Sequence, residues 1–444
     1  MPAPPIPMKC TGPPDGSSTR VTRREAQEYP ATGAPPPASR IVPPSPPFGN
    51  PPPGLRPQTS VPALGAGRTA FAAKRNRSGA VTVAALPAVD PNSGSGTALM
   101  THRERVLATF RFEATDRPAR DLMEQQVWPE LLAYFEREHG LRDLWEILAF
   151  LDTDFRWAWM HYSGPAQPPP TEALPEGWGG TYSDALYQRR LARAETVADV
   201  EAQPWPDPAW WTPPDLAALR AQWPDHALVI SPGWMPLFCS ACDAFGMENT
   251  LVKMALQPAV IEAFIRRQHA FYLDILARAL KAAQGHADIC WLGDDYASQE
   301  ALIMGPERWR RFIKPALAEQ VRVVREHGLL SLLHSCGAIR AIIPDLIEIG
   351  VDGLLVFQTS AAGMDPDSIA RDFGGRIVFY GGIDCQQLLT FGAPDDVERE
   401  VRRNLAAFAD CGGYIIANSH HCLANIQGRN LLAMCRAAAI AGAS

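Results

Sequence analysis

The clearest pattern in this chain is an alternation, from residue 227 onward, of short apolar runs with longer amphipathic segments. The runs have few polar positions and end at glycine or at a polar residue. Apolar runs of this kind are typical of parallel strands that are covered on both faces. The pattern predicts six strands, at 227–231, 288–292, 329–333, 351–357, 376–380 and 414–417.

Between and after these runs, the spacing of apolar residues predicts helices at 251–283, 306–327, 339–349, 366–373, 394–411 and 430–441. The helix at 306–327 begins with proline and is followed by Gly328, the usual order of these residues at helix ends. Pro315 lies inside that helix and is expected to kink it. Six strand–helix units in a row predict parallel strands, because each helix returns the chain to the same edge of the sheet.

An open doubly wound sheet and a closed (β/α)8 barrel both fit this alternation. No glycine-rich phosphate-binding sequence follows an early strand. The 345 residues from Met100 onward lie within the ~200–400 residues of barrels with insertions. We therefore predict an α/β fold of the (β/α)8 TIM-barrel class. Upstream of the alternation, we expect helices at 103–110, 129–139 and 141–151, a strand at 154–162, and an irregular region at 164–214.

Composition divides the chain at Met100. Residues 1–99 contain 21 of the 42 prolines, ten basic and four acidic residues, and few large apolar side chains. Such a segment cannot bury enough surface to offset its conformational entropy, so we expect a disordered proline-rich extension, or a true start at Met100. Residues 100–444 are expected to form the folded domain. With 31 basic and 44 acidic residues, that domain has no general affinity for nucleic acid or anionic membranes.

No run reaches the ~18 apolar residues that a membrane span needs. Nine cysteines at irregular spacing do not indicate a disulfide framework, so we expect a cytoplasmic protein with reduced thiols. Cys239 and Cys242 form a C-x-x-C in an apolar, helical context without a second such pair. We interpret these two residues as packing.

Unusual polar residues follow the strands, and in a barrel those strand ends meet at one mouth, where active sites lie. His334 and Cys336 follow one strand, and His420, His421 and Cys422 follow another. Three of these side chains could bind one zinc ion, either as one thiolate and two imidazoles or as two thiolates and one imidazole. The fourth position of the ion would then stay open, as in catalytic zinc sites. We predict zinc bound by His334 and Cys336 with Cys422 or His420. Such a zinc ion lowers the pKa of a bound thiol or activates water.

Other strand ends offer residues for proton transfer and binding. Neighbouring strand residues alternate sides, so at most one of Asp294 and Asp295 is expected to face the mouth, as a proton acceptor or a partner of His334. Asp384 either meets substrate or caps a helix. We predict catalytic roles for the three aspartates. Predicted cofactor-binding residues are Gln358, Gly381 and Gly382.

The second half of the chain resembles the uroporphyrinogen decarboxylase superfamily. The matching sequences are Gly293-Asp294-Asp295-Tyr296, His334-Ser335-Cys336-Gly337, Pro344 to Asp352, Gly381-Gly382-Ile383-Asp384 and Gly412-Gly413-Tyr414 with His420 and Asn430. The resemblance implies a (β/α)8 barrel. It also implies one of two activities: metal-free decarboxylation of a tetrapyrrole, or zinc-dependent transfer of a methyl group between a corrinoid protein and a thiol.

The decarboxylase branch carries an arginine-rich segment near its N-terminus that this chain lacks, whereas His334 and Cys336 match the methyltransferase pattern of His-x-Cys followed later by Cys. In this pattern Cys422 matches by residue type and His420 by its spacing to Asn430. The resemblance therefore implies a zinc methyltransferase with a thiol or methyl donor and a corrinoid protein as partners. Decarboxylation, as in porphyrin synthesis, and a non-catalytic corrinoid- or tetrapyrrole-binding protein are the alternatives.

Overall fold

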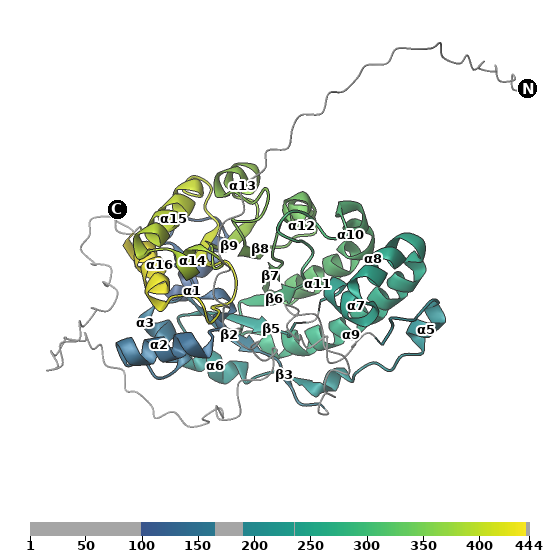
Figure 1. Ribbon diagram of the computed structural model, residues 1–444. Helices are drawn as coiled ribbons and strands as arrows, with labels where there is room; N and C mark the ends of the chain where they lie inside the picture. The colour runs from purple at the N-terminus through teal and green to yellow at the C-terminus, as the bar shows by residue number, and fades with distance from the viewer. Residues whose placement is uncertain (1–98, 165–189, 235, 441–444) are drawn as a thin grey trace, which may run out of the picture. The chain divides into compact units, whose positions relative to one another are not determined.

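Eight parallel strands form a nearly closed barrel in the computed structural model, which describes residues 99–164, 190–234 and 236–440 (Figure 1). The order around the sheet is β1-β10-β9-β8-β7-β6-β5-β2. The strands are β1 Ala119–Arg120, β2 Phe155–Trp159, β5 Ala227–Ser231, β6 Ile289–Gly293, β7 Leu330–His334, β8 Gly353–Phe357, β9 Val378–Ile383 and β10 Tyr414–Asn418. The predicted TIM-barrel class is confirmed.

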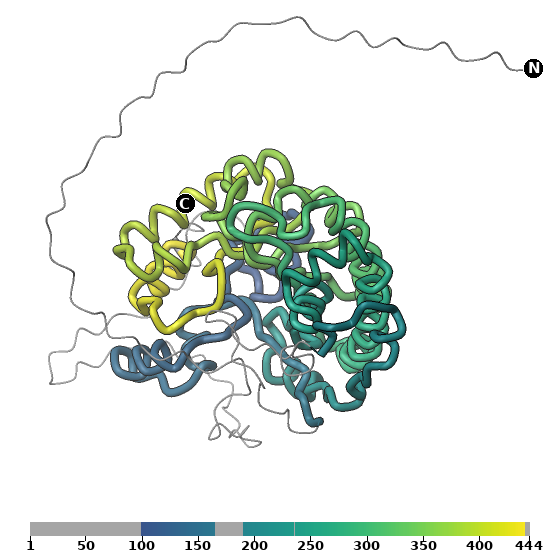
Figure 2. The backbone as a smooth tube through the Cα atoms, turned by 45° about the vertical axis from the view of Figure 1, so that its right-hand side comes forward, coloured from purple at the N-terminus to yellow at the C-terminus, as the bar shows by residue number. Residues whose placement is uncertain are grey.

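Helices surround the strands in both views (Figures 1 and 2). They are α1 His102–Phe110, α2 Pro129–His139, α3 Leu144–Phe150, α5 Val197–Glu201, α6 Leu216–Gln222, α7 Phe238–Phe245, α8 Met247–Leu256, α9 Pro258–Ala283, α10 Pro306–Phe312, α11 Lys314–Glu326, α12 Ile343–Glu348, α13 Pro366–Phe373, α14 Leu388–Phe391, α15 Pro394–Ala407 and α16 Gly428–Ile440. The short elements are the antiparallel pair of β3 His161–Tyr162 with β4 Trp211–Thr212, and the single turns η1 Met123–Gln125, η2 Pro208–Trp210 and η3 Arg340–Ile342. Among the described residues, no helix is long and apolar enough to cross a membrane.

Prolines divide two of the predicted helices. The predicted kink at Pro315 appears as a break at Ile313, between α10 and α11. The predicted single helix at 251–283 is wrong, because it is two helices, α8 and α9, that meet at Gln257 before Pro258. A residue before proline is biased away from helical backbone angles, and Gln257 has φ −135° and ψ 53°.

Two apolar clusters lie on the two faces of the sheet. The interior cluster fills the barrel and consists of Val106, Phe110, Ala119, Met123, Phe155, Trp157, Ala227, Val229, Ile289, Trp291, Leu332, Leu355, Val356, Val378, Tyr380, Ile415 and Ala417. The larger outer cluster lies between the sheet and its helices and includes Leu333, Cys422 and Cys435. Adjacent residues of one strand, such as Leu332 and Leu333, therefore belong to different clusters, as the alternation of side chains along a strand requires.

An ion-pair network joins the two ends of the sheet where β2 begins. The backbone nitrogen of Asp154 donates to the carbonyl oxygen of Arg120 at 2.9 Å, which connects β1 to β2. The Asp154 carboxylate pairs with Arg105 at 2.7 Å and Arg117 at 2.8 Å. Burial raises the pKa of Asp154, but the charge of Arg117 and the hydrogen bond from His102 outweigh it and hold the pKa well below its usual range. This end of the barrel is structural.

A side-chain cap marks the start of the first helix. Thr101 caps α1, its hydroxyl accepting from the Glu104 backbone, while the Glu104 carboxylate accepts from the Thr101 backbone nitrogen. This is the reciprocal arrangement of a capping box. The predicted extension at 1–99 lies outside the described residues except for Leu99. Residues 165–189 of the predicted irregular region also lie outside them.

Candidate functional site

Half-buried side chains at the carboxyl ends of five strands define a mouth at one end of the barrel. They are Trp159 at the end of β2, Trp234 after β5, Asp295 after β6, Cys336 after β7 and His420 after β10. Trp159, Trp234 and Cys336 pack on top of the interior cluster. We call these five residues the mouth, and the fully buried side chains beneath them determine how they are held.

A buried glutamate organises the centre of the site. Glu124 lies in η1, directly after β1, and its Oε1 is 2.5 Å from Nδ1 of His334. Its Oε2 is 2.7 Å from Nε2 of His421, and the indole nitrogen of Trp291 donates to Oε1 at 3.0 Å. A carboxylate only accepts hydrogen bonds, so both imidazoles donate to it. Glu124 therefore ties together β1, β6, β7 and the loop after β10.

This arrangement fixes the orientation of His334. Its Nδ1–H donates to Glu124, so its Nε2 faces Asp295, whose Oδ1 is 3.7 Å away. Burial raises the pKa of Glu124, but the charges of His334 and His421 outweigh it and hold the pKa well below its usual range. Burial lowers the pKa of His334, but Glu124 reverses this effect and raises it. An imidazole whose second nitrogen is held by a carboxylate is typical of metal ligands and of catalytic bases.

Glu124 adopts a backbone conformation that is uncommon outside glycine, with φ 52° and ψ 11°, and Gln125 has φ 51°. Two consecutive left-handed residues turn the chain sharply after the two-residue strand β1, which directs the Glu124 side chain into the barrel. Such conformations cost of order 1–3 kcal/mol each and concentrate at functional sites. The backbone nitrogen of Met123, one residue earlier, donates to Oδ1 of Asn418 on β10 at 3.0 Å and anchors the turn.

A second carboxylate, Asp121, lies in the barrel interior on the same segment. It accepts hydrogen bonds from Trp157 at 2.9 Å, Tyr380 at 2.7 Å and Gln125 at 3.0 Å. Burial raises its pKa to about 6, against the opposing effect of these donors. Neither Asp121 nor Glu124 was predicted from sequence. A strand of two residues shows no periodicity, and the only available signal was two acidic residues within a segment for which no helix or strand was predicted.

The two adjacent aspartates after β6 face different ways, as the alternation of side chains predicts. Asp294 is buried, and its carboxylate accepts from the backbone nitrogens of Leu237, Phe238 and Cys239, which caps α7. Burial raises the pKa of Asp294 to about 7. Asp295 lies at the mouth, where its Oδ1 accepts from the backbone nitrogen of Cys336 at 3.0 Å. Of this pair, only Asp295 is placed to meet a substrate.

The other predicted binding residues hold the loops around the mouth. Gln358 is buried, and its Oε1 accepts from the backbone nitrogen of Gly337 at 2.9 Å. The carboxylate of Asp384 accepts from the backbone nitrogens of residues 386–388 and thus caps the start of α14. Gly381 and Gly382 both have positive φ, and a Cβ on Gly382 would lie 2.4 Å from the Tyr414 hydroxyl. Functional roles for these residues stay predictions.

The predicted zinc ligands do not all lie together. Cys336 packs against the interior cluster at the mouth, whereas Cys422 is fully buried in the outer cluster, where burial raises the pKa of its thiol. The ring of His420 lies 6.0 Å from that of His334, between centroids. His334, Cys336 and His420 have the donor chemistry for zinc and Cys422 lies elsewhere. In the part of the chain that the structure describes, no three His, Cys, Asp or Glu side chains are close enough to share one ion.

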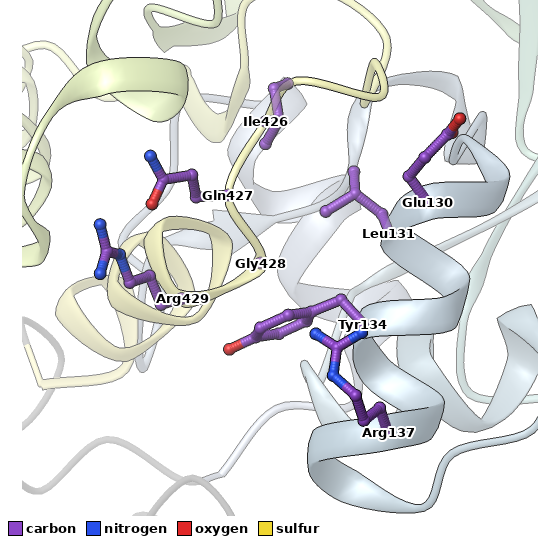
Figure 3. Close-up of a pocket in the computed structure, with 8 residues that line it drawn as sticks. All are labelled: Glu130, Leu131, Tyr134, Arg137, Ile426, Gln427, Gly428 and Arg429. Carbon is purple, nitrogen blue, oxygen red and sulfur yellow. The ribbon is translucent and has the colours of Figure 1, made fainter.

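Two cavities lie outside the mouth. One, of about 350 Å³, lies between α2 and the start of α16, which come from opposite ends of the described chain (Figure 3). Its lining includes Tyr134, Arg137 and Arg429. The other, of about 580 Å³, lies between the loops after β6, β7 and β8, beside Arg340 and Phe373. Neither is lined by a mouth residue.

Comparison with known proteins agrees with this geometry. Residues 228–439 match the family model described as uroporphyrinogen decarboxylase (URO-D). This part of the chain is a URO-D domain. His334 and Asp295 lie within the matched residues, and Glu124 lies upstream of them.

Two methyltransferases are among the proteins to which this chain is similar. It is 27% identical over 135 residues to methylcobamide:CoM methyltransferase MtaA of Methanosarcina barkeri, a match that covers 29% of this chain and 38% of that enzyme. The fold is similar to that of a methyltransferase from Methanosarcina mazei, with a TM-score of 0.53, 17% identity, and coverage of 76% of this chain and 98% of that chain. The chain thus spans well under half the length of the curated relative that it matches.

Proposed function

We propose that this chain is a methyltransferase that moves a methyl group from a corrinoid or a methylated small molecule to a thiol. The similarity to an enzyme named as a methylcobamide:CoM methyltransferase supports methyl transfer. The imidazole, thiol and carboxylate side chains at the mouth support a thiol as the methyl acceptor. The observation that carries the proposal is the hydrogen bond between Glu124 and His334, because it presents Nε2 of His334 beside Asp295 and Cys336.

Zinc is part of this proposal through three residues. His334, Cys336 and His420 have the donor atoms for the ion but would have to move closer together to hold it. When bound, zinc would lower the pKa of the acceptor thiol. Glu124 orients His334 and keeps its Nε2 directed at the mouth. Asp295 accepts the proton that the thiol releases, since its carboxylate lies at the mouth and is partly exposed to solvent.

The alternative, decarboxylation of a tetrapyrrole polyanion, is disfavoured by the charges around the mouth. Carboxylate substrates are held by arginine or lysine in charge-assisted pairs. The buried arginines Arg105, Arg117 and Arg120 pair with Asp116, Asp152 or Asp154 where β2 begins. Among the described residues, no lysine or arginine forms an ion pair with Asp121, Glu124 or Asp295. A non-catalytic tetrapyrrole-binding protein faces the same objection.

The proposal is tested with the full chain by following demethylation of methylcobalamin by absorbance in the presence of 2-mercaptoethanesulfonate. We expect turnover that Cys336→Ser abolishes and that Cys411→Ser, a change of another half-buried thiol outside the mouth, leaves unchanged. In parallel, carboxyl loss from uroporphyrinogen is measured without added metal. Decarboxylation without methyl transfer would overturn the proposal in favour of the alternative.

A further inference from the structure

The mouth is lined on one side by tryptophans. The rings of Trp157 and Trp159 on β2 are stacked with centroids 5.8 Å apart, and Trp159 lies 5.4 Å from Trp291 on β6. Trp291 lies 5.9 Å from Trp234, which in turn lies 5.3 Å from the ring of His334. Aromatic rings thus form a continuous wall from β2 to the central histidine, and we call these four tryptophans the aromatic wall.

The local sequence makes room for this wall. At Gly293, the last residue of β6, an added Cβ would lie 2.6 Å from the Trp291 ring and 2.9 Å from the Trp234 ring. Trp157 and Trp291 are buried and fixed by hydrogen bonds to Asp121 and Glu124. Trp159 and Trp234 are half-buried, unlike the other two tryptophans of the wall. The indole nitrogen of Trp234 has no hydrogen-bond partner among the described residues.

The ionisable groups beside the wall are carboxylates and histidines. Asp295 contributes a carboxylate at the mouth, 3.7 Å from Nε2 of His334. Asp121 and Glu124, which holds His334 and His421, lie beneath it. No lysine or arginine of the described chain pairs with any of the three. Indole faces attract cations through their quadrupole, and aromatic cages with this property recognise quaternary ammonium groups. A half-buried indole next to a carboxylate that has a histidine but no lysine or arginine beside it therefore favours a ligand that is cationic and apolar at once.

We propose that the mouth binds a methylated onium cation, with Trp159 and Trp234 against its methyl groups and Asp295 opposite its charge. This inference rests on the proposed methyl transfer and names the class of methyl donor. In the transfer, the lone pair of the acceptor thiolate forms the new S–C bond. The C–N bond of the ammonium donor breaks, and its electron pair stays on nitrogen, so that a neutral amine leaves.

The test compares choline with dimethylbutanol, the alcohol in which carbon replaces the charged nitrogen, by calorimetric titration of the full chain. We expect choline to bind at least about tenfold more tightly than the alcohol. Trp234→Leu is expected to remove this preference, and Trp234→Phe to retain part of it. Asp295→Asn, which keeps the shape of the side chain, is expected to weaken choline binding by a similar factor.

Trp145→Leu is the matched control, because Trp145 is an accessible tryptophan on α3, stacked on Trp223 and outside the mouth. Equal affinity for choline and the alcohol, binding of neither, or equal effects of Trp234→Leu and Trp145→Leu would each overturn the inference. The same preparation is assayed for methyl transfer from methylcobalamin to a thiol, which needs no onium donor. Methyl transfer without a cation preference would refute the onium site alone, and loss of methyl transfer would refute the proposed function.

Discussion

Nδ1 of His334, at the end of β7, and Oε1 of Glu124, in the turn after β1, lie 2.5 Å apart in the buried centre of the barrel. The two residues are 210 positions apart in the sequence. Since Glu124 also holds His421 and Trp291, its loss would release three side chains at once. The geometry of the mouth therefore depends on a residue that touches no predicted substrate position.

Glu124→Gln tests this dependence. Glutamine keeps the size of the side chain but cannot accept from both imidazoles and Trp291, so Nε2 of His334 loses its fixed direction. Changes of this kind in residues that orient ligands cost about 10–100-fold in activity or metal affinity. We expect that loss in methyl transfer, together with lower zinc affinity. Glu130→Gln, an exposed acidic residue at the start of α2, is the control and is expected to behave as wild type.

The positions of the cysteines predict which thiol binds metal. Cys336→Ser is expected to lower zinc content, measured by mass spectrometry of the purified full chain. Cys422→Ser is expected to retain zinc and to lose about 1 kcal/mol of stability, because its hydroxyl enters the apolar outer cluster. Loss of zinc in a folded Cys422→Ser protein would show that Cys422 is a ligand after all.

The ion-pair network where β2 begins predicts a large effect on stability. Asp154→Ala would leave Arg105 and Arg117 buried without their shared carboxylate. Breaking a buried pair from one side costs about 3–5 kcal/mol. We expect this loss in urea unfolding. Glu146→Ala, which removes an exposed i,i+4 pair with Arg142, is expected to cost no more than about 0.5 kcal/mol.

Asp121 predicts a dependence of stability on pH. Burial raises its pKa to about 6, above the ~3.9 of an unfolded aspartate, so the native state holds the extra proton between these values. The contribution of Asp121 to stability is therefore present at low pH and is lost as the pH rises through about 6. We expect Asp121→Asn to gain stability relative to wild type by up to about 3 kcal/mol between about pH 4 and pH 7.

Chemical unfolding of both proteins across this range measures the difference. Asp410→Asn, at an exposed position, is the control. A difference between Asp121→Asn and wild type that is the same at every pH would show that Asp121 does not titrate in this window.

The barrel could be predicted from sequence because its strands from β5 to β10 are long apolar runs separated by amphipathic helices. The break at Ile313 was also predictable, since Pro315 cannot continue the backbone hydrogen bonding of a helix. β1 could not be found in this way, because two residues carry no period. Glu124, which follows it, was missed for the same reason.

The candidate site was predictable only in part. That Asp294 and Asp295 face different ways follows from the strand geometry, and the structure assigns Asp295 to the mouth. Residue type could not decide between His420 and Cys422, because both follow the end of β10 and only the packing shows that Cys422 lies in the outer cluster. From the sequence, Cys239 was interpreted as a packing residue. In the structure its thiol lies 3.7 Å from the carbonyl oxygen of Asp295, directly beside the mouth.

The most direct test of the central claim is a single-turnover measurement with methylcobalamin and a thiol, comparing the full chain with His334→Asn. His327→Asn, at an exposed histidine at the end of α11, is the control. The account predicts that wild type and the control form the methyl thioether and that His334→Asn does not. Methyl transfer by His334→Asn at the wild-type rate would contradict the account.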